Sequence, residues 1–376
     1  MHTPLSPEEL GAWIRLTLEP DLGPAQARSL LATLGMPQNI YATPSTALAK
    51  VLPQPLARQI AQPAQPQIQE AIARVQTWLA EPGHHLLTLA DPAYPQALLD
   101  IHDPPLVLYV NGRTELLNRS ILAIVGARNA TPAGIDNATA FARHLASRGW
   151  CIASGLATGI DAAAHQGALA AGHEGGGTIA VLGTGVDIIY PAANLDLARQ
   201  IAAEGALISE FPLGTPSIAF QFPKRNRIVA GLARGVLVVE AAQRSGSLIT
   251  ARLATEIGRE VFAIPGSIHS PLSRGCHALI RQGAKLVESG EDISEELGHL
   301  PGTRTATAPP EKPVRRQARP GVRHAKLMAA LGHDPVHIDT LRTRTGLDWA
   351  ALNSQLLELE LESIVTRLPD GRFQQR

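Results

Sequence analysis

Between about residues 85 and 290, short continuous runs of apolar residues alternate with alanine-rich segments of helical character. A strand that is apolar on both faces is typical of a parallel sheet covered by helices on both sides. The pattern therefore predicts an α/β fold with an open, parallel-rich sheet, whose strand carboxyl ends share the edge where ligands bind. The expected strands are 106–110, 121–125, 151–153, 178–182, 207–209, 235–239, 261–264 and 285–287. The expected helices are 132–148, 160–171, 194–203, 247–257 and 277–282.

The first 82 residues have the apolar spacing of helices, and we interpret 1–82 as a helical N-terminal domain. A helix containing Leu10 and Trp13, a Pro and Gly breaker cluster at 20–24 and a second helix at 25–34 follow one another. This outline fits a helix-hairpin-helix or SAM-like unit, whose turn amides can bind a DNA phosphate, or an ordinary helical hairpin. Residues 52–67 are rich in Pro and Gln and predict a loosely structured connection.

The C-terminal part of the chain changes character twice after the α/β domain, which we place at 83–300. Residues 301–322 combine Pro, Thr, Ala and Arg with almost no bulky apolar residue, which predicts a flexible basic linker. Helical patterns at 323–331, 337–345 and 348–361 precede a hairpin of 364–368 and 372–375. Three helices and a terminal hairpin predict a winged-helix domain at 323–376.

Composition excludes several classes of protein. The 376 residues include 33 basic and 33 acidic side chains, and no apolar run reaches the about 18 residues of a membrane span. The first residues lack the basic-then-apolar pattern of a signal peptide. Two cysteines, Cys151 and Cys276, are too few for a disulfide scaffold or a four-cysteine zinc site. We therefore expect a cytoplasmic protein with buried, reduced thiols.

Glycine turns that follow three expected strands are candidate anion sites. Gly126 and Arg128 follow 121–125, Gly155 follows 151–153, and Ser245-Gly246-Ser247 opens a helix after 235–239. Glycine lets the backbone approach a ligand, and the amides of the next helix attract a phosphate. The first turn is not Gly-x-Gly-x-x-Gly, and the chain has no Gly-Lys dipeptide. We therefore expect neither a nicotinamide cofactor nor a Walker-type ATP site.

The densest polar feature is residues 220–228, which we interpret as a turn drawn toward the sheet edge. Cations for phosphates beside a ring for a base are typical of single-stranded nucleic acid sites, and a solvated basic turn is the alternative. The candidate binding residues here are Phe222, Lys224, Arg225, Asn226 and Arg227, and Arg244 adds a cation next to the Ser-Gly-Ser turn.

Three titratable residues near these turns have expected roles. Glu240 ends a strand, and we expect it to hold Arg227 or Arg244 rather than act as a base. Asp161 opens a helix and suits a cap. His165 lies one turn later on the same face, so the two side chains could pair, with a catalytic acid/base pair as the less favoured alternative. They lack a third ligand at metal spacing, so we expect no metal site.

Several segments in one order resemble the DNA-processing protein A family, also called DprA or Smf. They are IVGARNATPAG, IASGLATGIDAAAH, TIAVLGTGVDIIYPAAN, LISEFPLGTP, FQFPKRNRIVAGLARGVLVVEAAQRSGSLITARLA, VFAIPGS and ALIRQGAKLV. The resemblance implies a Rossmann-like domain that binds single-stranded DNA, forms a homodimer, protects incoming DNA and loads the RecA recombinase during natural transformation. It implies no catalytic activity, cofactor or membrane partner.

Within the resemblance, the family's Gly-Ser-Arg turn falls on Gly126-Ala127-Arg128, with Ala127 in place of the usual serine. The family's dimer-forming edge should include Leu279 and Ile280. A nucleotide phosphoribohydrolase is the alternative from another class, but residues 243–248 lack its Pro-Gly-Gly turn and no glutamate soon follows Thr250. A winged-helix transcription regulator is a weaker alternative.

Overall fold

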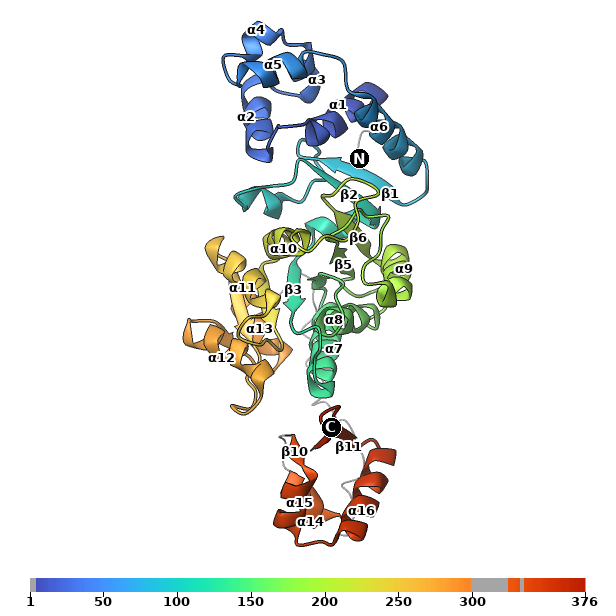
Figure 1. The fold of residues 1–376 in the computed structure, drawn as a ribbon, viewed down its shortest axis with the longest axis vertical. Coiled ribbons are helices and arrows are strands. Elements are labelled where there is room, and N and C mark those ends of the chain that lie inside the picture. Colours follow the sequence, from blue (N-terminus) through green and yellow to red (C-terminus); the bar gives the residue numbers. More distant parts are fainter. Residues whose placement is uncertain (1–4, 299–323, 332–334, 376) are drawn as a thin grey trace.

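The structure, a computed structural model, describes residues 5–298, 324–331 and 335–375 and is built around a nine-stranded sheet (Figure 1). The strand order is β1-β2-β6-β5-β4-β3-β7-β8-β9. Every pairing from β6 to β9 is parallel, and β1-β2 and β2-β6 are antiparallel. The strands are β1 (His84–Thr88), β2 (Val107–Gly112), β3 (Ile121–Val125), β4 (Cys151–Ser154), β5 (Thr178–Val181), β6 (Ala206–Ser209), β7 (Gly235–Val238), β8 (Glu260–Ala263) and β9 (Lys285–Leu286). The predicted open, parallel-rich sheet is confirmed.

Both faces of the sheet are buried, which explains the continuous apolar strands. Ile121, Ala123 and Val125 of β3 join one core cluster, and Leu122 and Ile124 join another on the opposite face. The helices of this region are α7 (Pro132–Ser147), α8 (Ile160–Leu169), α9 (Leu195–Glu204), α10 (Gln221–Leu232), α11 (Gly246–Glu256), α12 (Arg274–Arg281) and α13 (Gly290–Leu297). The 3₁₀ helices are η1 (Gln96–Asp100), η2 (Thr114–Asn118), η3 (Ala192–Asn194) and η4 (Pro271–Ser273).

Helix α10 corrects the sequence interpretation, because the cation-rich segment at 220–228 forms helix and not a turn. Pro223 lies in its first turn, where a missing amide breaks no helical hydrogen bond. Ile228, Val229 and Leu232 bury its C-terminal half against the sheet core. Burial of these side chains therefore stabilises a helix, although the proline and the cluster of charges suggested a turn.

The N-terminal region is helical, as expected: α1 (Pro7–Leu18), α2 (Pro24–Leu34), α3 (Pro37–Ala42), α4 (Ser45–Leu48), α5 (Gln54–Ile60) and α6 (Pro66–Leu79). The expectation of a loose connection at 52–67 is wrong, because α5 and the start of α6 occupy most of it. Leu56, Ala57 and Ile60 pack into the helical core. That core continues into the sheet through residues such as Leu86 and Tyr109, so the two regions share buried apolar surface.

The C-terminal residues form a separate apolar core of their own and confirm the winged-helix fold. The elements are α14 (Ala325–Leu331), β10 (Val336–His337), α15 (Ile338–Thr345), α16 (Trp349–Leu361), β11 (Val365–Arg367) and β12 (Arg372–Gln375), with the strand order β10-β12-β11. Ser363, just before the first wing strand, has a φ of 57°, which a glycine would adopt at lower cost. The predicted linker, 301–322, lies outside the described residues. No described helix is both long and apolar enough to cross a membrane.

Candidate nucleic-acid interface

A groove of about 660 Å³ lies at the carboxyl ends of β3 and β4, bounded by α10 and by the start of α11. We call it the sheet-edge groove. Nine of the predicted site residues line it: Gly126, Arg128, Gly155, Phe222, Arg225, Asn226, Ser245, Gly246 and Ser247. Ser245 caps α11 by accepting a hydrogen bond from the amide of Ser247, and its hydroxyl lies 2.7 Å from that of Ser247. The parallel topology has therefore gathered three separate glycine turns into one cavity.

The groove combines an exposed cation with two aromatic rings, of which Tyr190 is exposed and Phe222 is half-buried. Arg128 is exposed and makes no ion pair within the described residues, and its guanidinium lies 5.8 Å from the centre of the Phe222 ring. Tyr190 lies beside Phe222, with ring centres 5.4 Å apart and 44% of its surface exposed. Sequence reasoning missed Tyr190, although an aromatic residue shortly after the glycine turn that follows β5 was the available signal. The site thus offers a positive charge and two rings at one position.

Arg225 lies beneath the groove and is not a free cation. Only 4% of its surface is exposed, and its guanidinium donates to the carbonyl oxygens of Gly155, at 2.8 Å, and Val181. A Cβ on Gly155 would lie 2.6 Å from this guanidinium, so the turn needs glycine there. Burial lowers the pKa of Arg225 to about 10, and the nearby Asp161 charge opposes the shift, so the guanidinium stays charged at neutral pH. Arg225 therefore connects the turn after β4 to α10 and stabilises its position.

Lys224 and Arg227 do not line the sheet-edge groove. Phe222, Arg225 and Asn226 are three and four residues apart and share one face of α10, whereas Lys224 and Arg227 lie on another face. Lys224 lies 3.9 Å from Glu210, and Arg227 lies 2.6 Å from the same carboxylate. The helical period therefore places the polar residues of this segment on two faces of α10, whereas a turn could have directed all of them to one ligand.

Glu240 does not hold an arginine, which corrects the expectation for this residue. One carboxylate oxygen accepts from the amide of Thr131 at 2.9 Å, and the other accepts from the Thr131 hydroxyl at 2.6 Å. Within the described residues it makes no ion pair with Arg227 or Arg244. Thr131 is the N-cap of α7, and a carboxylate is stabilised at a helix N-terminus. Glu240 thus fixes the start of α7 to the end of β7.

Asp161 and His165 serve separate local structures. Asp161 accepts from the amides of Gly155 and Ala157, at 3.1 and 3.3 Å, and burial raises its pKa while the charge of Arg225 opposes that shift. His165 Nδ1 lies 2.8 Å from the Thr178 hydroxyl, and burial lowers the pKa of the ring to about 3. The imidazole is therefore neutral and bonded to β5, and no hydrogen bond joins it to Asp161 in the described structure.

Comparisons with known proteins identify the family. A family model described as DNA recombination-mediator protein A matches residues 85–298, and one described as DprA winged helix domain matches residues 308–371. The chain belongs to the DprA/Smf family. Protein Smf of Escherichia coli (strain K12) is 43% identical over 297 residues, which cover 78% of each chain.

Two solved structures of the DprA/Smf family are also similar. DNA processing protein A from Streptococcus pneumoniae has a TM-score of 0.65 and 34% identity, covering 78% of this chain and 99% of that one. DNA processing protein A from Helicobacter pylori, described for its unique single-stranded DNA binding mode, has a TM-score of 0.52 and 31% identity. It covers 57% of this chain and 95% of that chain.

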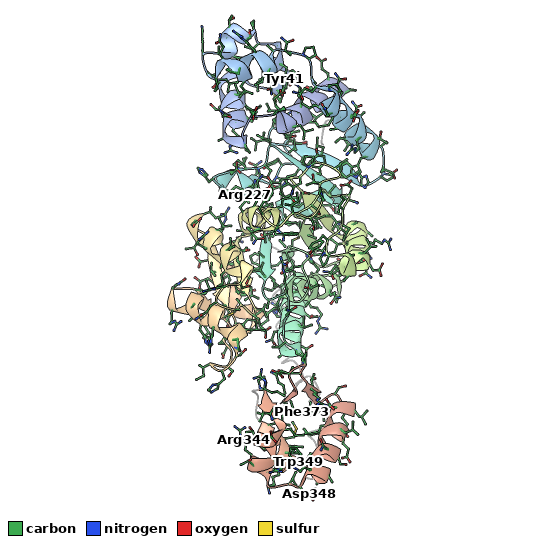
Figure 2. All side chains as sticks on the ribbon, viewed as in Figure 1. Tyr41, Arg227, Arg344, Asp348, Trp349 and Phe373 are labelled. Atoms are coloured by element: carbon green, nitrogen blue, oxygen red, sulfur yellow. The ribbon has the colours of Figure 1, made fainter. Side chains whose placement is uncertain are left out.

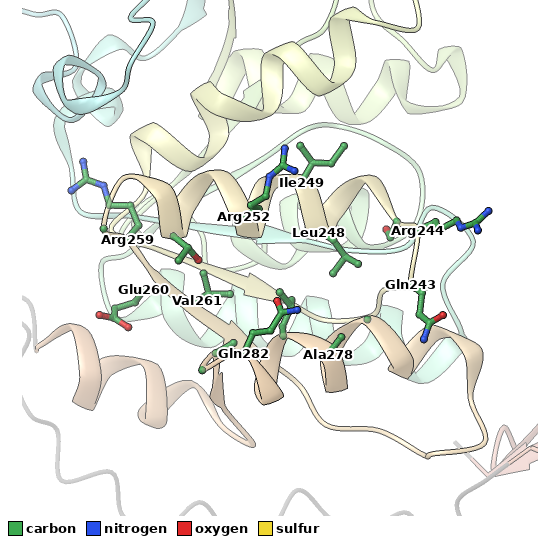
Figure 3. Close-up of a pocket in the computed structure, with 17 residues that line it drawn as sticks. Gln243, Arg244, Leu248, Ile249, Arg252, Arg259, Glu260, Val261, Ala278 and Gln282 are labelled. Atoms are coloured by element: carbon green, nitrogen blue, oxygen red, sulfur yellow. The ribbon is translucent and has the colours of Figure 1, made fainter.

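Arg244 of this DprA/Smf family member lies at a second groove, of about 790 Å³, between α11 and α12 (Figure 3). Leu248 of α11 and Gln282, just after α12, face the space between the helices. Leu279 lines this groove, and Leu279 and Ile280 are both half-buried against the sheet core. Arg244 is therefore separated from the sheet-edge groove, although Ser245 lines both cavities.

The cysteines of this family member are buried thiols. Cys151 and Cys276 are buried and unpaired, as expected, and burial raises the pKa of both thiols to about 12. Within the ranges that the structure describes, no three His, Cys, Asp or Glu side chains are placed to hold a metal ion.

Proposed function

We propose that this chain binds single-stranded DNA in the sheet-edge groove, without regard to base sequence and without enzymatic activity. The observation that carries the proposal is the exposed Arg128 next to the half-buried ring of Phe222 and the exposed ring of Tyr190, among three glycine turns. A guanidinium and turn amides suit phosphates, and the ring faces suit unpaired bases of any kind. The relative from Helicobacter pylori, described by its single-stranded DNA binding mode, supports the same ligand.

A nucleotide hydrolase is less well supported by the geometry. Such an enzyme needs a base near the bound nucleotide, and Glu240 and Asp161 are the acids beside the glycine turns. Both oxygens of Glu240 accept hydrogen bonds from Thr131, and Asp161 is buried against backbone amides. Both carboxylates are therefore engaged in holding the backbone of the turns, which favours a structural role over that of a general base. Incubation of the protein with AMP should release no adenine, and release above a protein-free control would favour the enzyme.

The biological role we propose is protection of incoming DNA and loading of the RecA recombinase during natural transformation, in the cytoplasm. The family model's description as a recombination mediator supports a recombinase partner. The test is RecA filament assembly on single-stranded DNA, measured with and without this protein. Faster assembly supports the role, and an unchanged rate contradicts it.

We further propose a homodimer formed through α12. Leu279 and Ile280 are apolar and only half-buried, so part of each side chain is free to contact a second copy. Two grooves held together would raise avidity by a high effective concentration for the second contact. Leu279→Glu and Ile280→Glu should each give a folded monomer with weaker DNA binding. Light scattering of the wild-type protein at tens of micromolar, roughly the range for a weak interface, provides the direct test, and a monomer there would exclude the dimer.

The primary experiment compares single-stranded and duplex oligonucleotides of equal length by fluorescence anisotropy across a salt series. We expect tighter binding of the single strand, weakening by about 0.7 log units per phosphate contact for each tenfold rise in salt. Oligonucleotides of different base composition should bind with similar affinity, because ring stacking accepts every base. Equal affinity for duplex and single strand at moderate salt would overturn the proposal.

A further inference from the structure

Helix α10 has a second face, directed away from the sheet-edge groove. Arg227 lies on it, close to where the N-terminal helices meet the sheet (Figure 2). Its Nη2 atom lies 2.6 Å from Oε2 of Glu210 and 3.4 Å from Oδ2 of Asp103. Glu210 directly follows β6, and Asp103 lies in the segment between η1 and β2. Two acids from outside α10 therefore hold this face of the helix.

Asp103 also holds the N-terminal helices. Its Oδ1 atom accepts a hydrogen bond from Arg28 of α2, so one carboxylate is shared between an arginine of α2 and an arginine of α10. The side chains of Arg28, Asp103 and Arg227 are 20%, 28% and 14% exposed, so water and salt screen these pairs less than surface pairs. Burial by itself would raise the pKa of Asp103, but the hydrogen bond from Arg28 and the charges of Arg227, Arg28 and Lys224 lower it. Asp103 is therefore ionised at neutral pH.

We propose that Asp103 is a positioning residue through which the N-terminal helices set the affinity of the sheet-edge groove for single-stranded DNA. This inference rests on the proposed function. Asp103 does not touch the groove; it holds Arg227, and Arg227 belongs to the same helix as Phe222, Arg225 and Asn226.

Helix α10 can couple the contact between Asp103 and Arg227 to the sheet-edge groove, because the helix is short and packed along its length. Arg227 and Phe222 are five residues apart, which is about 7.5 Å along a helix axis. Arg225, between them, is bonded to the carbonyl oxygen of Gly155, so a shift of α10 moves both the Phe222 ring and the turn after β4. Loss of Asp103 leaves Arg28 without its carboxylate and Arg227 with Glu210 alone. The groove then keeps all of its own residues but loses one of the supports that orient them.

The test is Asp103→Asn in the full chain, with binding to a single-stranded oligonucleotide as the readout. Removing an acid makes the protein more positive, and charge alone would therefore tighten binding of a polyanion. The proposal predicts the opposite sign: affinity about fivefold weaker, in the range by which residues remote from a ligand alter coupling. Unchanged or tighter binding by a folded Asp103→Asn protein would overturn it.

The matched control is Asp100→Asn. Asp100 lies three residues earlier and pairs with Arg259 at 2.8 Å, a contact that does not involve α10. Its loss changes the net charge by the same amount, so binding should stay equal or tighten slightly. Equal weakening by both substitutions would show a general charge or stability effect and contradict the positioning role.

Arg28→Ala provides a second route that leaves Asp103 in place. Arg28→Ala should also weaken DNA binding. The double variant with Asp103→Asn should bind DNA no more weakly than Asp103→Asn alone, because both substitutions remove the same contact between Arg28 and Asp103. Independent, additive losses would contradict a shared path from α2 to α10. Because Arg28→Ala also removes a cation, which by itself weakens binding of a polyanion, its independent readout is faster hydrogen exchange of residues 221–232 without DNA. That readout keeps the inference testable if Asp103→Asn does not fold.

Hydrogen–deuterium exchange of residues 221–232 separates failure of this inference from failure of the proposed function. Without any DNA, Asp103→Asn should speed exchange in α10, whereas Asp100→Asn should leave it unchanged. If the wild-type protein binds no single-stranded DNA, the proposed function fails and the claim about groove affinity fails with it. If wild-type binding is strong and α10 exchanges equally in both variants, only the positioning role is overturned.

Discussion

Arg128 and Arg225 have the same side chain and lie at the same groove, yet their surroundings give them different roles. Arg128 is exposed and has no ion-pair partner among the described residues. Arg225 is buried, donates to backbone carbonyl oxygens and lies near the carboxylate of Asp161. An exposed guanidinium exchanges water for a phosphate at little cost to the fold, whereas a buried one is part of the fold.

Arg128→Ala should weaken single-stranded DNA binding about tenfold, because a charged hydrogen bond contributes about 1.5 kcal/mol, and leave the melting temperature unchanged. Arg225→Ala should instead lower the free energy of unfolding by about 3 kcal/mol, because Asp161 would remain buried without its cation. Urea unfolding and anisotropy on both variants check this. Equal free energies of unfolding for the Arg128→Ala and Arg225→Ala proteins would contradict a structural role of Arg225.

His165 gives a pH dependence whose sign follows from burial. Its folded pKa of about 3 lies below the unfolded value of 6.5, so between these values the unfolded chain binds the extra proton. Stability is fully present above about pH 6.5 and is lost as the pH falls. This group should cost about 2 kcal/mol of unfolding free energy between pH 7 and pH 5.

His165→Asn, which can still bond Thr178, should flatten that part of the stability profile. Urea unfolding at several pH values measures the profile for both proteins. The same slope in the variant and in the wild-type protein would assign the acid sensitivity to other groups.

At the scale of the element, α10 determines what the groove presents. Its period of 3.6 residues directs Phe222, Arg225 and Asn226 to the groove and Lys224 and Arg227 to the acids Asp103 and Glu210. The helix therefore joins the ligand site to the N-terminal region instead of presenting all its cations to one ligand.

Phe222→Leu and Lys224→Ala test this division of faces. Phe222→Leu keeps an apolar side chain but removes the ring, and it should weaken binding about tenfold, within the usual stacking contribution of about 1–3 kcal/mol per base. Lys224→Ala should change affinity by about twofold or less, because Glu210 lies 3.9 Å from the Lys224 ammonium and offsets its charge. The reverse order in an anisotropy titration would place the DNA on the other face of α10.

At the scale of the whole molecule, the two flanking regions differ in how they are stabilised. The N-terminal helices and the sheet bury side chains in one continuous cluster, which includes Leu30, Ile60 and Tyr109. The C-terminal residues form their own cluster around Leu341, Leu352 and Phe373. The N-terminal helices therefore contribute to the stability of the sheet, whereas the C-terminal region is stabilised by an apolar core of its own.

A chain ending at residue 322 should keep single-stranded DNA affinity within about twofold, because none of the described winged-helix residues lines the sheet-edge groove. A chain beginning at residue 83 should aggregate or unfold, because Leu86 and Tyr109 lose the helices that cover them. Size-exclusion chromatography and anisotropy check both. Loss of nearly all affinity in the first protein would make the winged helix part of the site.

The sequence by itself determined the parallel-rich sheet, the winged helix and the glycine turns, because these depend on local burial patterns and on backbone freedom. Nine of the twelve predicted binding residues line one groove: six follow the ends of parallel strands, which meet at one edge of the sheet, and three come from α10. Only the tertiary structure decided the roles of Arg225, Arg227 and Glu240. Arg227 bonds to partners 17 and 124 residues away, and Glu240 to one 109 residues away. The choice among such distant partners depends on which helix face is buried, and no local pattern of residues contains that information.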